Sequence, residues 1–390
     1  MWNFDEPAKR EGTDCIKYDR REETFGVKDV IPMWVADMDF NTPDFIVASV
    51  EKRMEHEIYG YSFRPAEYYQ SMISWIKTRH NWIIEREWIS FSPGIVPALN
   101  FCTLAYTQPG DNIIVQPPVY FPFFSAAESH GRNLVYNRLK ESDGKWTMDF
   151  ESLIAGIDSK TKMIIISNPH NPVGRVWTPE ELTNLADICL KNNIIIISDE
   201  VHCDLILPGF IHTPLASLSE KISENTITLI APSKTFNLAG LSTSSVIIQN
   251  PALRKSFNRV VDNLHVGSGN IFGTIASIAA YSNGHNWLDA LLDYIDNNIE
   301  FVKDYCGKMI PEIIPVQPEA TYMIWLDCRK FGMSGKELQN FFVTRAGVGM
   351  NEGSTFGPGG EGFMRMNLGT THQIVTKAME QIEKAVSTLR

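Results

Sequence analysis

The sequence predicts an α/β protein in which a large domain is built on a mostly parallel sheet covered by helices. Between residues 112 and 249, short apolar runs alternate with helical patterns. The runs are apolar on both faces, as is typical of parallel strands that helices cover on both sides. We expect strands at 113–115, 134–136, 163–166, 194–197, 227–230 and 246–248.

A helix over residues 179–191 has the clearest boundary signals. Thr178 is a good helix cap, and Pro179 suits the first helical position. Glu181 stands three residues after Thr178, as a capping box requires. The sequence therefore predicts a helix that begins at Pro179.

The chain after Pro251 has a different pattern, with long helices followed by a compact α+β segment. Helices are expected at 253–264, 271–281 and 287–309. Beyond them we expect residues 322–326, 335–344 and 374–389 to form the compact α+β segment. The last of these has apolar residues in helical period at Ile374, Ala378, Ile382, Val386 and Leu389.

Composition indicates a globular protein with a large core, since 44% of its 390 residues are hydrophobic. The formal charge of −11 argues against nucleic-acid binding, which needs a basic face. The six cysteines lie far apart without metal-ligand spacing, so we predict no metal site and a reducing, cytoplasmic setting. The N-terminus lacks a signal-peptide pattern, and no apolar run approaches the ~20 residues that span a bilayer, so no membrane attachment is expected.

Three polar side chains form the candidate functional site. Asn171, Asp199 and Lys234 each stand shortly after an apolar run. In an open α/β sheet, ligands bind outside the carboxyl ends of the strands, so we expect these side chains to converge. A desolvated lysine in such a cleft can be a Schiff-base nucleophile. The alternative is an exposed lysine in a loop.

Asp199 stands just beyond four consecutive isoleucines. Its carboxylate is therefore expected at the edge of a dry region, where it needs a cationic or hydrogen-bonding partner. A helix cap at a strand-to-helix turn is the alternative role.

Five segments in order carry a resemblance to a known family. They are PMWVADMDF at 32–40, YGY at 59–61, PPVY at 117–120, APSKTFNLAGL at 231–241 and FMRMN at 363–367. From about Pro32 to the C-terminus, the chain resembles the class I/II aminotransferases, which are fold type I pyridoxal-phosphate (PLP) enzymes. Within that family it is similar to the MalY/PatB-type carbon–sulfur lyases, whose best-known activity is cystathionine β-lyase.

The resemblance implies PLP as the cofactor and a particular domain organisation. Residues 1–43 are expected to contribute to a smaller α+β domain, 44–285 to form the large PLP-binding domain, and 286–390 to complete the smaller domain. The resemblance also implies a small amino-acid substrate and a homodimer with shared active sites.

Lys234, Asp199 and Tyr120 are the catalytic candidates that the resemblance implies. Lys234 is expected to hold PLP as a Schiff base and then to move the substrate α-proton. Asp199 is expected to keep the ring nitrogen charged, which makes the ring a better electron sink. Tyr120 resembles the aromatic residue that stacks on the ring, with core packing as the rival role.

Asn171 and His202 resemble the family residues near the phenolic oxygen of the cofactor. Asn171 is expected to donate a hydrogen bond to that oxygen, although Asn-Pro is also a common turn. Many aminotransferases have tyrosine at the position of His202. A histidine there fits the lyase branch, and a buried structural histidine is the alternative.

The cofactor phosphate is expected at a glycine turn that leads into a helix. Residues 92–96 form this turn and precede a helical stretch expected at 97–106, whose N-terminus offers free N–H groups to a phosphate. Ile95 and Val96 are expected to bind the phosphate there, and Ser233 adds a hydroxyl group. Ser242 stands where many relatives have a phosphate-binding arginine. We therefore expect Tyr61 of a second subunit to contribute. The alternative is that Tyr61 packs within its own subunit.

Arg365 resembles the arginine that binds the substrate α-carboxylate. A guanidinium group forms two parallel hydrogen bonds with a carboxylate, so it can orient the Cα–H bond for removal. Asp37 and Asp39 belong to the segment at 32–40, and the pattern assigns neither of them a chemical role.

The resemblance predicts a carbon–sulfur β-lyase that acts on L-cystathionine or a related cysteine S-conjugate. Its products would be a thiol such as homocysteine, pyruvate and ammonia. A true aminotransferase is the main alternative, because it shares every cofactor residue. A catalytically silent PLP-sensing regulator is a third possibility, and the lack of a basic helix-turn-helix module argues against it.

Overall fold

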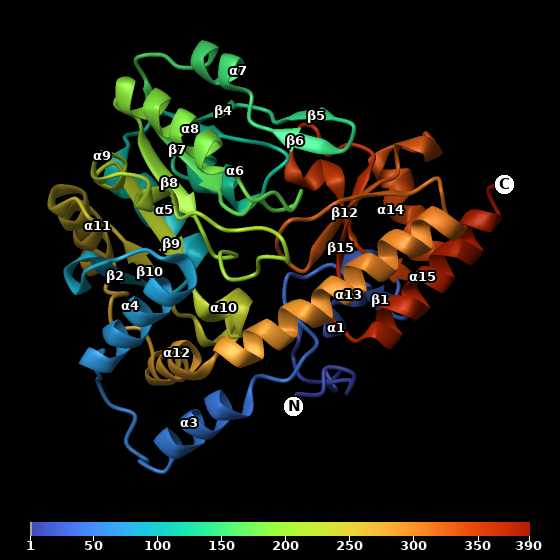
Figure 1. The fold of residues 1–390 in the computed structure, drawn as a ribbon, viewed down its shortest axis with the longest axis horizontal. Coiled ribbons are helices and arrows are strands. Elements are labelled where there is room, and N and C mark those ends of the chain that lie inside the picture. The colour runs from blue at the N-terminus through green and yellow to red at the C-terminus, as the bar shows by residue number, and fades with distance from the viewer. Residues whose placement is uncertain (1) are drawn as a thin grey trace.

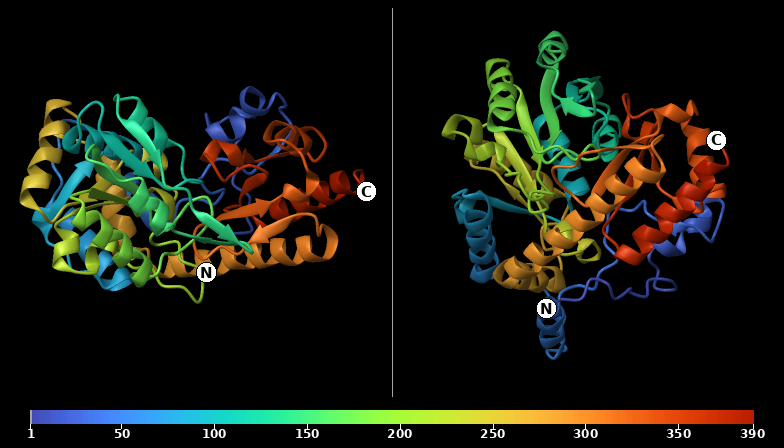
Figure 2. Two further views of the ribbon diagram at one scale, coloured as in Figure 1. Left: turned by 90° about the horizontal axis from the view of Figure 1, so that it is seen from above. Right: turned by 45° about the vertical axis from the view of Figure 1, so that its right-hand side comes forward.

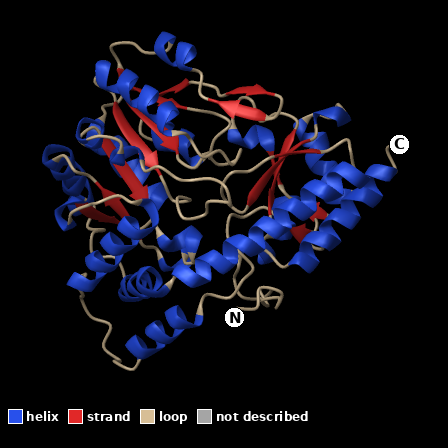
Figure 3. Cartoon of the chain, in the orientation of Figure 1, coloured by secondary structure: helices blue, strands red, loops and turns tan. Residues whose placement is uncertain are grey.

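A seven-stranded sheet forms the centre of the larger part of the protein in the computed structural model, which describes residues 2–390. The strand order is β2-β10-β9-β8-β7-β3-β4, and the strands from β9 to β4 pair in parallel. Helices enclose these strands (Figure 3). The bounds are β2 Ile89–Ser92, β3 Asn112–Val115, β4 Asn133–Tyr136, β7 Thr161–Ser167, β8 Ile195–Asp199, β9 Thr226–Ile230 and β10 Ser244–Ile247.

Both faces of the central strands are buried. On one face, Ile164 and Ile196 pack in a cluster with side chains of helix α8. On the other face, Ile165 and Ile197 pack with side chains of α5, α6 and α11. Successive residues of a strand point to opposite faces, so a sheet covered on both sides needs continuous apolar runs rather than alternation.

The helices vary widely in length, and α13 is the longest helix in the described chain. It runs from the large sheet towards the C-terminal part (Figure 1). The helices are α1 Ile16–Asp19, α2 Arg21–Phe25, α3 Asp44–Met54, α4 Ala66–His80, α5 Ile95–Tyr106, α6 Pro122–Glu128, α7 Phe150–Ala155, α8 Pro179–Lys191, α9 Glu220–Ser223, α10 Pro232–Thr235, α11 Pro251–Asn263, α12 Ile271–Asn283, α13 His285–Met309, α14 Gly335–Thr344 and α15 His372–Ser387.

A smaller antiparallel sheet lies in the C-terminal part, in the order β11-β12-β15-β14. Figure 2 shows it as a separate group of strands beside the large sheet. A two-stranded parallel pair, β1 with β13, joins the N-terminal segment to this part, and β5 and β6 form a hairpin. The bounds are β1 Ile31–Pro32, β5 Lys140–Ser142, β6 Lys145–Thr147, β11 Ile314–Val316, β12 Met323–Asp327, β13 Val348–Gly349, β14 Asn351–Glu352 and β15 Phe363–Asn367.

The predicted fold class is confirmed, and all six predicted strands of the large sheet are present. Helix α8 begins at Pro179 with the predicted capping box between Thr178 and Glu181. Strand β2 was not predicted, because its two serines interrupt the apolar run that marks the other strands. Both partners of β10 run antiparallel to it, which the apolar pattern alone does not reveal.

The domain boundaries at residues 43 and 285 stay a prediction. The pairing of β1 with β13 is compatible with a smaller domain assembled from both ends of the chain. Among residues 2–390, no helix is long and apolar enough to cross a membrane.

Candidate functional site

A cavity of about 200 Å³ lies at the carboxyl ends of β7, β8 and β9. Parallel strands end at the same edge of a sheet, so the loops that follow them meet there. Eight residues predicted from the sequence line this cavity: Ile95, Val96, Tyr120, Asn171, Asp199, His202, Ser233 and Lys234. Tyr61 is not among the lining residues.

Lys234 lies on the short helix α10, just beyond β9. Its Nζ donates a hydrogen bond to the backbone oxygen of Ala36, at 2.7 Å. Burial lowers the pKa of this amine to about 8, and the nearby charge of Arg365 adds to the effect. An exposed loop position is therefore wrong for Lys234. An amine with this pKa can exchange a proton near neutral pH.

Asp199 is the last residue of β8 and is buried. Its Oδ1 accepts a hydrogen bond from the backbone N–H of Val201, at 3.2 Å. Burial raises the pKa of the carboxyl group to about 7. The helix-cap alternative is wrong, because the chain enters a turn rather than a helix after Asp199. A buried carboxyl group beside a cavity is a partner for a cationic group of a ligand.

His202 and Asn171 approach the cavity from the loops after β8 and β7. His202 is buried, and burial lowers its pKa to about 3, so the imidazole is neutral. Within the described chain, its Nδ1 has no hydrogen-bond partner. The Oδ1 of Asn171 accepts a hydrogen bond from Arg365, which leaves the Nδ2 amide of Asn171 to act as a donor.

Arg365 lies on β15 of the smaller sheet, with 3% of its surface exposed. Its guanidinium group donates to Asn171 Oδ1 at 3.1 Å, to Asn351 Oδ1 at 2.8 Å and to the backbone oxygen of Trp34 at 2.9 Å. All three acceptors are neutral, and among residues 2–390 Arg365 Nε has no acceptor. Arg365 therefore carries a buried positive charge that suits a carboxylate ligand.

The N-terminus of helix α5 forms another wall of the cavity. Ile95 and Val96 occupy the first turn, where backbone N–H groups have no acceptor within the helix. The hydroxyl-bearing residues Ser233, Ser242 and Thr243 line the same cavity. This combination of amides and hydroxyls suits a phosphate group.

Tyr120 lines the cavity from the loop between β3 and α6. It is half-buried, and its ring centroid lies 5.2 Å from that of Phe121 and 6.3 Å from that of Phe123. Both roles considered for Tyr120, core packing and contact with a ligand, are therefore compatible with its position.

Two residues that contact the elements of the site had no sequence signal of their own, Ala36 and Asp204. Ala36 contributes a backbone oxygen, which accepts hydrogen bonds from both Lys234 and Tyr322. Any residue type can supply a backbone carbonyl, so sequence patterns do not mark it. Asp204 accepts from the hydroxyl of Thr235 at 2.8 Å and from His80 at 2.8 Å, behind the helix that carries Lys234. Its contacts link distant segments of the chain.

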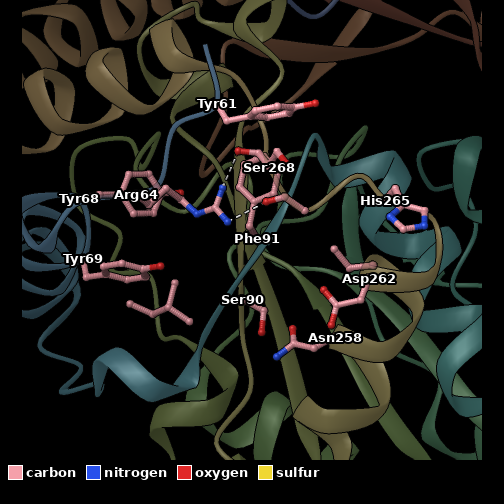
Figure 4. Close-up of a pocket in the computed structure, with 13 residues that line it drawn as sticks. Tyr61, Arg64, Tyr68, Tyr69, Ser90, Phe91, Asn258, Asp262, His265 and Ser268 are labelled. Atoms are coloured by element: carbon pink, nitrogen blue, oxygen red, sulfur yellow. Dashed lines mark hydrogen bonds between the residues drawn. The ribbon is translucent and has the colours of Figure 1, made fainter.

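Tyr61 lies outside the cavity, in an exposed segment between α3 and α4. It borders a separate surface pocket of about 830 Å³, together with Arg64 and Phe91 (Figure 4). Arg64 in this pocket donates to the backbone oxygens of Gly267 and Ser268. The side chain of Tyr61 is fully exposed in the single chain, and which subunit it serves stays a prediction.

Known proteins resemble this chain in both sequence and structure. The sequence model for aminotransferases of class I and II matches residues 28–382. The cystathionine beta-lyase PatB of Bacillus subtilis is 41% identical over 99% of this chain and 100% of its own. Among solved structures, PLP-containing cystalysin from Treponema denticola has a TM-score of 0.97 at 36% identity, with 100% of both chains covered. A PLP-bound C–S lyase from Staphylococcus hominis has a TM-score of 0.92 at 33% identity, over 99% of this chain and 98% of its own.

Proposed function

Because the chain belongs to the class I and II aminotransferase family, we propose that it is a PLP-dependent carbon–sulfur β-lyase. Its substrate is L-cystathionine or a related cysteine S-conjugate. The reaction consumes water and releases a thiol, pyruvate and ammonia. With L-cystathionine the thiol is homocysteine.

The cavity fits the cofactor in charge and hydrogen bonding. Asp199 offers a buried carboxyl group for a ring nitrogen, and the N–H groups of Ile95 and Val96 offer donors for a phosphate. Lys234 offers the amine for a Schiff base. When bound, PLP supplies a positively charged ring that accepts the electron pair released as the α-proton leaves.

Arg365 and Lys234 then act on the substrate itself. Arg365 binds the α-carboxylate and orients the Cα–H bond towards the cavity, since its guanidinium group has no anionic partner among residues 2–390. Lys234 removes the proton from Cα, and its pKa of about 8 suits an amine that alternates between base and acid. Loss of the thiolate from Cβ completes the elimination, and the aminoacrylate that is released takes up water to give pyruvate and ammonia.

One observation carries this proposal. A single cavity is lined by Lys234, by Asp199 and by the first turn of helix α5. Arg365 contacts that cavity through Asn171. A lyase needs a proton-transfer group, an electron sink and a carboxylate anchor in one place, and the relatives named above as lyases support elimination as the outcome.

The decisive assay uses purified holoenzyme with L-cystathionine, with and without an added keto acid. We expect equal amounts of pyruvate and homocysteine, independent of the keto acid. A product amino acid formed from the keto acid, without pyruvate release, would identify an aminotransferase instead. Borohydride reduction followed by peptide mass spectrometry is expected to find the cofactor on Lys234, and reduced cofactor on another lysine would contradict the assignment.

The active assembly that we propose is a cytoplasmic homodimer in which Tyr61 reaches the cofactor phosphate of the partner subunit. The full exposure of Tyr61 supports this arrangement, as does the serine at position 242, which leaves the phosphate site without an arginine there. The free and widely separated cysteines are typical of a reducing compartment.

A further inference from the structure

Four charged residues form a compact cluster at the segment 34–38, which contains one of them, Asp37. Arg10 donates to both carboxylate oxygens of Asp37, at 2.8 and 2.7 Å, and to Asp39 at 2.7 Å. Lys17 donates to the other oxygen of Asp39 at 2.9 Å. Lys17 and Asp39 are almost fully buried, at 0% and 2% exposure. Two cations thus face two anions, and the buried charges are compensated.

The segment 34–38 that this cluster holds carries no regular secondary structure. It follows β1 and precedes α3, and backbone hydrogen bonds fix its flanks at Met33 and Asp39. Between these two points, side-chain contacts supply the long-range hydrogen bonds to its backbone. Arg10 also donates to the backbone oxygen of Met38, at 3.1 Å, which ties the cluster directly to the main chain.

The other side of this segment faces the candidate active site. The backbone oxygen of Trp34 accepts from Arg365 at 2.9 Å. The backbone oxygen of Ala36 accepts from Lys234 at 2.7 Å and from the hydroxyl of Tyr322 at 2.9 Å. One stretch of backbone therefore contacts both the proposed proton-transfer group and the proposed carboxylate anchor.

Two asparagines fasten the same stretch from either side. Asn367, two residues after Arg365, donates to the backbone oxygens of Val35 and Asp37 at 2.6 and 2.7 Å. Asn237, three residues after Lys234, exchanges two hydrogen bonds with the backbone of Met38, at 2.8 and 3.0 Å. The segment is thus fastened to both elements that carry the reactive side chains.

We propose that Arg10, Lys17, Asp37 and Asp39 are positioning residues whose ion-pair cluster sets the backbone oxygens of Trp34 and Ala36, and through them Arg365 and Lys234. This role rests on the proposed function. It gives Asp37 and Asp39 a purpose that their sequence context did not reveal. The Ala36 oxygen is the acceptor that holds the Lys234 amine in the structure.

The test uses Asp37→Asn, which keeps the shape of the side chain and removes its charge. Asp37 is the more exposed of the two aspartates, and Arg10 retains Asp39 as a partner, so we expect this variant to fold. L-Alanine is the probe, because it has an α-carboxylate and no leaving group at Cβ. Its half-saturating concentration, read from the absorbance of the bound cofactor, is expected to rise about tenfold, since small misplacements of binding groups cost this much or more.

A purely structural role predicts a different result. It would lower the midpoint of thermal unfolding and leave L-alanine binding within twofold of the wild type, and that result overturns the proposal. The control is Glu23→Gln, the same chemical change in an exposed ion pair with Arg20, which is expected to leave L-alanine binding unchanged.

A second variant and a double-mutant cycle provide two further tests of the proposal. Arg10→Lys replaces the two-pronged contact with a single one and is expected to weaken L-alanine binding in the same direction. Adding Asp37→Asn to Arg10→Gln is expected to cost little beyond Arg10→Gln alone, because the two residues act as one unit, whereas additive losses contradict the proposal. The binding readout needs no thiol release, so it remains valid even if the wild type fails to cleave L-cystathionine.

Discussion

Burial shifts the pKa values of Asp199 and Lys234, two key residues of this site. The carboxyl group of Asp199 keeps its proton up to about pH 7, and the amine of Lys234 loses its proton at about pH 8, in both cases mainly because burial disfavours the charged form. A bound cation beside Asp199 reverses this preference, because it stabilises the carboxylate. The site is therefore prepared for a positively charged ring.

We predict that Asp199→Asn has opposite effects on activity and on stability. Turnover is expected to fall at least about a hundredfold, because the ring nitrogen loses its anion. The folded, cofactor-free wild type holds the Asp199 proton up to about pH 7, whereas the unfolded chain releases it near pH 4. The contribution of Asp199 to the free energy of unfolding therefore falls between about pH 4 and pH 7.

The variant removes this pH-dependent loss of stability. Cofactor-free Asp199→Asn is accordingly expected to unfold at a higher temperature than the wild type at pH 8, with the gap closing as the pH is lowered towards 4. Thermal unfolding of both proteins across this range provides the measurement. Parallel curves would show that burial does not hold the carboxyl group neutral.

We predict that Arg365→Lys lowers kcat/KM by about tenfold to a thousandfold, or roughly 1.4 to 4 kcal/mol of transition-state stabilisation. A lysine keeps the charge and loses the planar fork, so it cannot hold Asn171, Asn351 and a substrate carboxylate together. Steady-state kinetics with L-cystathionine measure the effect. Arg329→Lys, at an exposed arginine, is the control and is expected to leave the kinetics unchanged.

At the scale of single elements, the site depends on where strands end and where one helix begins. Strand β8 places Asp199, and β9 places Lys234 through the short helix α10. Helix α5 begins at Ile95, directly beside the cavity, so the positive end of its dipole lies at the cavity wall. These placements follow from local sequence, since they depend on apolar runs and the residues that interrupt them.

We predict that Ile95→Pro weakens PLP binding by about tenfold or more. Proline is tolerated at the first helical position, and the extended backbone of Gly94 is compatible with a following proline, so helix α5 is expected to form. The variant loses one N–H group, and a hydrogen bond to a charged group contributes about 1.5–3 kcal/mol.

Ile95→Ala is the matched control, because it removes the side chain and keeps the amide. Titration of the cofactor-free proteins with PLP measures the affinity, and thermal unfolding monitors the fold. If both variants bind PLP equally well, the Ile95 amide does not contact the phosphate.

In the protein as a whole, the segment 34–38 connects two parts of the chain. Its backbone oxygens contact Arg365 on the smaller sheet and Lys234 beside the larger one. Nearby, the pairing of β1 with β13 fastens the N-terminal segment to the C-terminal part. The proposed substrate anchor, Arg365, and the proposed proton-transfer group, Lys234, therefore both contact residues close to the N-terminus.

We predict that the two subunits of a dimer share residues at each active site. Lys234→Ala is expected to be inactive, and Tyr61→Phe is expected to be impaired because the cofactor phosphate loses a hydroxyl group. When the two variants are mixed and their subunits exchange, hybrid dimers are expected to regain activity at one site that contains both wild-type residues. Absence of recovery after verified exchange would assign Tyr61 to its own chain.

Local sequence patterns predict much of the secondary structure of this protein. The strands and helix α8 could be predicted because apolar runs, caps and prolines act over a few residues. The polar residues at strand ends could be predicted for the same reason. The serines of β2 and the antiparallel direction of β10 carried no such signal.

The meeting of other groups that are distant in sequence could not be predicted and became visible in the folded chain. The contacts of Lys234 with the Ala36 oxygen and of Arg10 with Asp37 join residues 198 and 27 positions apart, and no short-range pattern records such pairs. The raised pKa of Asp199 likewise depends on burial by the packed loops around it. Local sequence patterns predict which residue types stand at the strand ends. The charge states of these residues and the role of Asp37 and Asp39 arise from packing, because desolvation and ion pairing exist only once the chain has folded.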